Sequence, residues 1–168
     1  VVDVCRLPSA FSDAGDLGRS TTHRWRIDTA GATPTVAQEV LADVEQDLPT
    51  IDRRYTGRPH RHAWYAAVGH DDAGDFDFVG VHHLDHRTGE LTGWDPGPGE
   101  RVAETVFVPS STSAGEGEGW MLGYTYDQAT DRSDLVVLDA LDVGRGPVAR
   151  AHLPVRVPYG FHGTFISD

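Results

Sequence analysis

The sequence predicts an all-β protein made of short antiparallel strands. Runs rich in β-branched and aromatic residues recur about every 10–15 residues, and Gly, Asp or Pro separates them. Reversals such as Asp-His-Arg-Thr-Gly at 85–89 and Gly-Arg-Gly-Pro at 144–147 join neighbouring runs into hairpins. We therefore expect strands at 22–28, 61–69, 77–85, 90–95, 104–109, 119–127, 134–140, 148–155 and 160–166.

Repeated hairpins with Asp-rich turns narrow the architecture. Many short hairpins indicate a sandwich, a barrel or a propeller, and antiparallel meanders of this style are typical of propeller blades. Segment 32–46 is the one stretch with a helical composition. Its Val residues suit a strand equally well and no C-capping Gly follows, so we expect it to be extended. We also expect most of five aromatic residues to form the core, with one or two of them lining a tunnel instead; they are Trp25, Trp64, Phe107, Trp120 and Phe165.

Length and charge restrict the class of protein. The 168 residues suit one domain, 1–168, and no apolar run reaches the roughly 18 residues of a membrane span. The net charge is −12, with 14 basic residues, all of them Arg, against 26 acidic ones. This balance argues against nucleic acid or an anionic membrane as a general partner, because binding phosphate requires a positive surface.

The cysteine content and the amino terminus bear on location. Cys5 is the single cysteine, so neither a disulfide framework nor a Cys-based zinc site is expected. We expect a reducing compartment, the cytoplasm. The first residues carry neither an initiator Met nor the basic and apolar regions of a signal peptide, and we expect the chain to be part of a longer protein.

For most of the nine histidines, the position in the predicted strands and turns does not indicate a metal site. His82 and His83 are adjacent on a predicted strand and would face opposite sides, and His86 falls in the following turn, in solvent. His60 and His62 share a face at an exposed strand start. His162 differs, because Phe161, Gly163 and Phe165 surround it. Its context leaves two alternatives open, a metal or catalytic role and a hydrogen-bonded core histidine.

Three stretches in order, 47–65, 103–127 and 133–165, carry a set of motifs. They contain Asp-Leu-Pro-Thr-Ile-Asp, Glu-Thr-Val-Phe-Val-Pro, Gly-Trp-Met-Leu, Leu-Asp-Ala and a terminal Pro-Tyr-Gly-Phe-His-Gly-Thr. In this order the chain resembles the C-terminal part of the carotenoid cleavage oxygenase family. That family includes stilbene-cleaving dioxygenases and the isomerohydrolase of the retinal pigment epithelium.

The resemblance implies a fold and a metal centre. It implies the C-terminal blades of a seven-bladed β-propeller with a non-haem Fe(II) on its axis, bound by four histidines. His162 matches the histidine of the terminal motif. Glu104 and Asp47 match glutamates that accept hydrogen bonds from the ligand imidazoles. Asp47 departs from the family pattern, in which Glu is usual, and its side chain is one methylene shorter.

The resemblance also implies an activity. We expect a dioxygenase that uses O₂ to cleave a conjugated double bond of an apolar polyene or stilbene into two carbonyl products. The first three iron ligands of the family match no histidine of this chain, so the isolated chain is expected to be inactive. Membrane contact by the parent protein and its oligomeric state stay open. The alternatives are a non-catalytic fragment or binding module and an unrelated propeller hydrolase that uses carboxylates and Ca²⁺.

Overall fold

The computed structural model describes residues 1–9, 18–70, 76–102, 104–158, 160 and 162–166. It divides the chain into two compact units, Val1–Asp47 and Leu48–Asp168. In the described part, no helix combines the length and the hydropathy that crossing a bilayer requires. The prediction of one partial domain over 1–168 stays a prediction.

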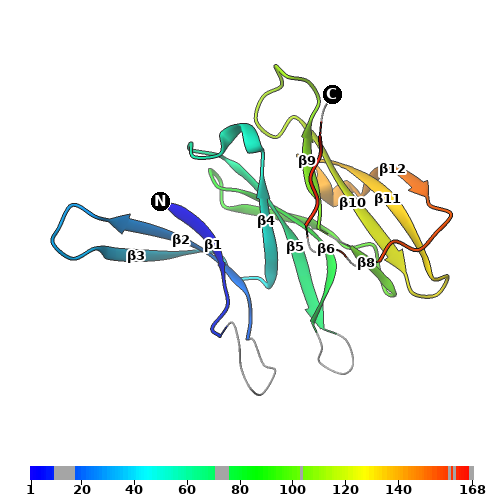
Figure 1. Cartoon of the computed structure of the whole chain (residues 1–168), viewed down its shortest axis with the longest axis horizontal. Coiled ribbons are helices and arrows are strands. Elements are labelled where there is room, and N and C mark those ends of the chain that lie inside the picture. The colour runs from blue at the N-terminus through cyan, green and yellow to red at the C-terminus, as the bar shows by residue number, and fades with distance from the viewer. Residues whose placement is uncertain (10–17, 71–75, 103, 159, 161, 167–168) are drawn as a thin grey trace. The chain divides into compact units, whose positions relative to one another are not determined.

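The first unit contains a three-stranded antiparallel sheet (Figure 1). Its strands are β1 (Val2–Arg6), β2 (Thr21–Asp28) and β3 (Thr35–Ala42), in the order β1-β2-β3. The predicted extended conformation of 32–46 is therefore confirmed over β3. Strand β1, a short run of five residues, was not predicted.

The second unit contains two antiparallel sheets. One has the order β4-β5-β6-β7 and the other the order β12-β11-β10-β8, with β9 also paired to β10. The strands of the first are β4 (Gln46–Ile51), β5 (His62–His70), β6 (Phe76–Asp85) and β7 (Glu90–Trp94). Those of the second are β8 (Glu100–Val102), β9 (Val106–Pro109), β10 (Gly119–Asp127), β11 (Arg132–Asp139) and β12 (Pro147–His152). Two short 3₁₀ helices, η1 (Arg53–Tyr55) and η2 (Val143–Arg145), connect strands.

The core of the second unit is shared by its two sheets. Its fully buried side chains come from β5, β6, β8, β10 and β11 and from the segment that leads into η2; they are Trp64, Val81, Val102, Met121, Leu138, Ala140 and Val143. Trp64 packs flat on Phe107 and donates its indole N–H to the Ala140 carbonyl oxygen at 2.7 Å. The tryptophan's one polar atom is thus paired, as burial requires.

Two of the five aromatic residues, Trp120 and Phe165, do not lie in the core of this chain. Trp120 is 39% exposed and Phe165 is 50% exposed in this chain, whereas Trp64 is completely buried. Trp120 stands on β10, where Met121 takes the inward-facing position. Because side chains alternate across a strand, only one of these two neighbours can enter the core.

The predicted strand at 160–166 is also wrong for the residues that the structure describes there. Gly160 and residues 162–166 have no strand conformation. The Gly163 amide donates to a side-chain carboxylate, that of Glu104, rather than to a neighbouring strand. A side-chain acceptor has taken the donor that a β-ladder would use.

Candidate metal centre

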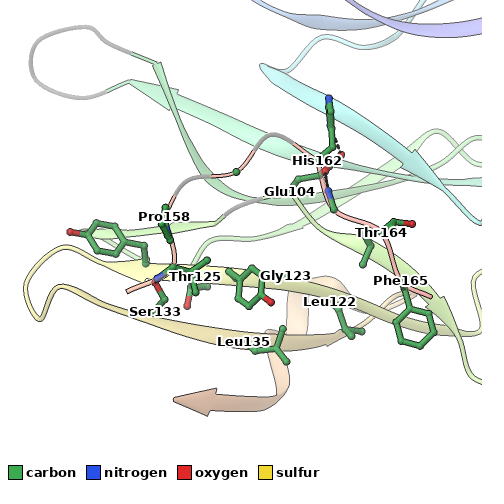
Figure 2. Close-up of a pocket in the computed structure, with 16 residues that line it drawn as sticks. Glu104, Leu122, Gly123, Thr125, Ser133, Leu135, Pro158, His162, Thr164 and Phe165 are labelled. Carbon is green, nitrogen blue, oxygen red and sulfur yellow. Dashed lines mark hydrogen bonds and ion pairs between the residues drawn. The ribbon is translucent and has the colours of Figure 1, made fainter. Parts of the chain in front are cut away.

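His162 and Glu104 are in contact, although 58 residues separate them in the sequence. The imidazole Nδ1 lies 3.2 Å from Glu104 Oε1, and the backbone N–H of Gly163 donates to Glu104 Oε2 at 2.7 Å. A carboxylate can only accept, so Nδ1 carries the proton and Nε2 keeps its lone pair. Figure 2 shows the ring extending away from Leu122 and Leu135, with dashed contacts to Glu104.

Glu104 is placed by the strand that follows it. It lies two residues before β9, whose Val106 pairs with Leu122 of β10. A Cβ on Gly123, the next residue of β10, would lie 2.7 Å from Thr105 Cγ2. Thr105 is buried, so the absence of a side chain at Gly123 leaves room for Glu104 and Thr105 just before β9.

The two side chains differ in exposure. The Glu104 side chain is 17% exposed and that of His162 is 73% exposed. A fixed carboxylate therefore orients a ring whose Nε2 is open to a ligand. This arrangement is the one in which a carboxylate holds a metal-binding imidazole in its correct tautomer, and the donor set fits one neutral nitrogen ligand of an iron ion.

A groove of about 430 Å³ lies beneath the segment that carries His162. The groove lies within the second unit and is mostly apolar. Its apolar lining includes Val106, Leu122, Leu135, Val157, Pro158 and Phe165. Glu104 and His162 are themselves among the residues that line this groove (Figure 2).

Asp47, the other predicted carboxylate, is the last residue of the first unit and stands near the start of β4, which continues into the second unit. Asp47 faces the thiol of Cys5, which also lies 3.9 Å from Thr22 Oγ1. Burial raises the pKa of Cys5 to about 12, and the negative charge of Asp47 adds to this rise. The predicted role of Asp47 beside a metal-binding imidazole stays a prediction.

Two histidines predicted to lie at the surface are buried against each other. His62 Nδ1 lies 2.9 Å from His83 Nε2, and the exposed fraction of each residue is 6%. His62 pairs with Asp85 across β5 and β6, and its neighbour Trp64 pairs with His83, which brings the two rings together. Burial, with a smaller contribution from the nearby His62, lowers the pKa of His83 to about 4. These rings form a core pair.

The other members of that histidine cluster fit the predictions in part. His82 is half-buried on the face of β6 opposite to His83, as the alternation of the strand predicts. His86 is half-buried, with its ring 5.1 Å from that of His60, so the prediction that it lies in solvent is wrong.

A second histidine–carboxylate pair occurs in the second unit. His152 Nδ1, on β12, lies 2.9 Å from Asp134 Oδ1, on β11. Asp134 also accepts from Arg150 Nη1 at 3.0 Å, and Arg150 donates to Glu100 as well. No sequence motif marked this pair, because it arises from the register of two strands.

Comparison with known proteins identifies the family. A profile of the retinal pigment epithelial membrane protein family matches residues 1–167. The chain therefore belongs to this family, that of the carotenoid cleavage oxygenases. This membership agrees with the predicted resemblance and removes the support for an unrelated propeller hydrolase.

Two curated relatives illustrate the similarity in sequence. The chain is 34% identical over 156 residues to lignostilbene-α,β-dioxygenase isozyme III of Sphingomonas paucimobilis, with 88% of this chain and 32% of the relative covered. It is 32% identical over 172 residues to the carotenoid cleavage oxygenase of Mycobacterium tuberculosis, with 98% and 34% covered. The chain thus spans about a third of the length of these relatives.

Solved structures show the same relation in three dimensions. Cobalt-substituted apocarotenoid oxygenase of Synechocystis matches with a TM-score of 0.87 and 26% identity, covering 99% of this chain and 36% of that one. The lignostilbene dioxygenase of Pseudomonas brassicacearum matches with a TM-score of 0.78 and 30% identity, covering 85% and 32%. The predicted fold class, antiparallel all-β structure forming part of a propeller, is confirmed.

Proposed function

We propose that the protein containing this chain is a non-haem Fe(II) dioxygenase. It would cleave a conjugated double bond of a carotenoid, apocarotenoid or stilbene into two carbonyl products. The observation that carries the proposal is the contact between His162 and Glu104 in a member of this family. The names of the relatives support the substrate class, since they include a lignostilbene dioxygenase and carotenoid cleavage oxygenases.

His162 would hold the iron through Nε2. Glu104 accepts a hydrogen bond from Nδ1–H, which fixes the tautomer, restrains rotation of the ring and makes Nε2 more basic. A neutral imidazole adds no charge to the metal, while the nearby carboxylate partly balances its two positive charges. When bound, the iron would supply the site at which O₂ is activated.

The rest of the ligand set is proposed to come from the parent protein. His162 supplies one nitrogen, and an isolated imidazole that is 73% exposed binds a metal weakly. We therefore expect the 168 residues alone to bind iron poorly and to be inactive. This exposure is also what favours the second candidate, a non-catalytic module that folds or binds a partner.

The experiment compares two histidine variants of the iron-containing parent protein. His162→Ala removes the proposed ligand, and His152→Ala is the matched control, because it removes an exposed histidine that also contacts a carboxylate. Iron content by elemental analysis and O₂-dependent aldehyde formation from stilbene and carotenoid substrates are measured. We expect loss of iron and product in His162→Ala only.

Two results would contradict the proposal. If His162→Ala retained its iron, His162 would not be a ligand. If the unmodified parent protein carried no iron and formed no aldehyde, the non-catalytic module would be the better description. A cytoplasmic location stays a prediction.

A further inference from the structure

The segment that carries His162 has little of its own structure to hold it. The described residues 160 and 162–166 form neither helix nor strand. The direction of the imidazole therefore depends on the few side chains that bond to this segment. Two such bonds reach the two residues that follow His162 in the sequence, Gly163 and Thr164.

The bond to Thr164 comes from Arg53. Arg53 Nη1 donates to Thr164 Oγ1 at 2.7 Å, across 111 residues of sequence. A second hollow, of about 370 Å³, is lined by Arg53, Thr164, Phe165 and Val108, so the terminal segment is not closely packed where the bond crosses. A hydrogen bond, rather than tight packing, connects the segment to η1.

Arg53 is part of η1, and contacts of its neighbours Asp52 and Arg54 hold this short helix in place. The carboxylate of Asp52 is 1% exposed, accepts the Arg54 backbone N–H at 3.1 Å and forms an ion pair with the Arg54 guanidinium. Arg54 Nη1 also donates to the Ala114 carbonyl oxygen at 2.9 Å, which ties η1 to the loop before β10. Asp52 and Arg54 thus form an ion pair within this short segment, and Arg53 reaches outward to Thr164 instead.

We propose that Arg53 is a positioning residue for His162. Its bond to Thr164 and the bond of Glu104 to Gly163 hold two consecutive residues from two separate places in the fold, η1 and the segment just before β9. Together they set the direction of Nε2. This inference rests on the proposed function, since it concerns the ring that would bind iron, and it adds a residue that does not touch the ring.

The first test measures the segment itself and requires no metal. Arg53→Met keeps an unbranched apolar stem and removes the guanidinium donor, and Thr164→Val removes the acceptor with little change of shape. Amide exchange of Gly163 by NMR in the 168-residue chain reports its bond to Glu104. We expect exchange to rise several-fold in either variant, and the double variant to match the single ones because the two changes break one bond.

The second test measures the metal in the parent protein. Dissociation of Co(II), followed by its visible absorption, should be about tenfold faster in Arg53→Met, at the lower limit seen for outer-sphere partners of a ligand. Arg53→Lys keeps a donor and should recover part of the loss. Arg58→Met is the matched control, because Arg58 is exposed and follows closely in the chain; we expect it to bind Co(II) normally.

The outcomes separate this inference from the function on which it rests. Unchanged Gly163 exchange, or Co(II) loss equal in Arg53→Met and Arg58→Met, overturns the positioning role. A lower melting temperature with an unchanged Co(II) spectrum and dissociation rate also overturns it, because it shows a structural role alone. If His162→Ala binds Co(II) normally, the proposed function itself fails, whatever Arg53 does.

Discussion

Two histidine–carboxylate pairs in the second unit have nearly the same geometry. His162 Nδ1 lies 3.2 Å from Glu104, and His152 Nδ1 lies 2.9 Å from Asp134. Both rings are largely exposed, at 73% and 83%, and both carboxylates are largely covered, at 17% and 14%. By distance and exposure alone, each could be a metal ligand with its orienting carboxylate.

The difference lies in what else bonds to the carboxylate. Asp134 is shared with the guanidinium of Arg150, which also reaches Glu100, so a cation already occupies that site. Glu104 has the neutral Gly163 amide as its second donor. A divalent cation placed at His152 would be repelled by Arg150, whereas at His162 it would meet a carboxylate without a competing charge. The other partners of the carboxylate thus decide which pair suits a metal.

The largest expected effect comes from removing one carboxylate's charge. Glu104→Gln keeps the side-chain length but leaves an amide N–H₂ against one of the two donors, His162 or Gly163. We expect the Co(II) affinity of the parent protein to fall by about 10–100-fold. Asp134→Asn is the control and should leave that affinity unchanged. Equal losses in both variants would mean that the two pairs do not differ in the way described.

A substitution on β10 should disturb one pair and spare the other. Gly123→Ala places a Cβ 2.7 Å from Thr105 Cγ2 and 3.5 Å from the Glu104 carbonyl oxygen. We expect it to lower the free energy of unfolding by about 1–3 kcal/mol through overpacking, and to weaken Co(II) binding as Glu104 moves. Gly144→Ala, whose Cβ would meet one atom at an ordinary 3.5 Å, is the control for urea unfolding and metal titration.

A third pair, His62 with His83, extends the comparison to the core. The pKa of His83 is about 4 in the folded protein, lowered by burial, against about 6.5 when unfolded. Between these values the unfolded chain binds more protons, so the free energy of unfolding should fall as the pH drops from about 6.5 to about 4. Asp85, whose pKa is lowered mainly by its hydrogen bond with Arg61, affects the free energy of unfolding at more acidic pH. Urea unfolding at several pH values measures this dependence. The free energy of unfolding should change less with pH in His83→Gln than in His152→Gln.

The smallest expected effect concerns the charges around Asp134. Asp134→Ala removes the partner of Arg150 and His152 on two paired strands, and we expect a loss of about 1 kcal/mol. The loss should shrink in 1 M NaCl, because salt screens partly exposed charges. Glu104→Ala should cost less stability, since Glu104 holds an irregular segment. Urea unfolding at low and high salt measures both, and a salt-independent loss would argue against an ionic contribution.

The strands of the second unit were largely predictable because the sequence alternates clearly there. The expected 119–127 and 77–85 differ from β10 and β6 by at most one residue at an end. Strands β1, β4 and β8 were missed, since short runs without strong alternation resemble loops. Their place in a sheet is set by partners that are distant in sequence.

The candidate site was predictable only through the terminal motif. Nothing local connects Glu104 with His162, and their contact depends on how the terminal segment crosses the sheet. The burial of His62 and His83 depends on the register of β5 and β6, which composition does not reveal. Nothing local in the sequence singles out Arg53, because its bond to Thr164 joins residues 111 positions apart.

The environment of Cys5 has a consequence for the chemical durability of the chain. Peroxide and alkylating reagents attack the thiolate, and a thiol with a pKa of about 12 stays protonated at neutral pH. Burial of Cys5, reinforced by the charge of Asp47, is therefore the reason to expect that this lone sulfur survives storage in air without sulfenic acid or intermolecular disulfide. Its slow reaction with iodoacetamide would become rapid on unfolding, which makes it a natural reporter of the opening of the first unit.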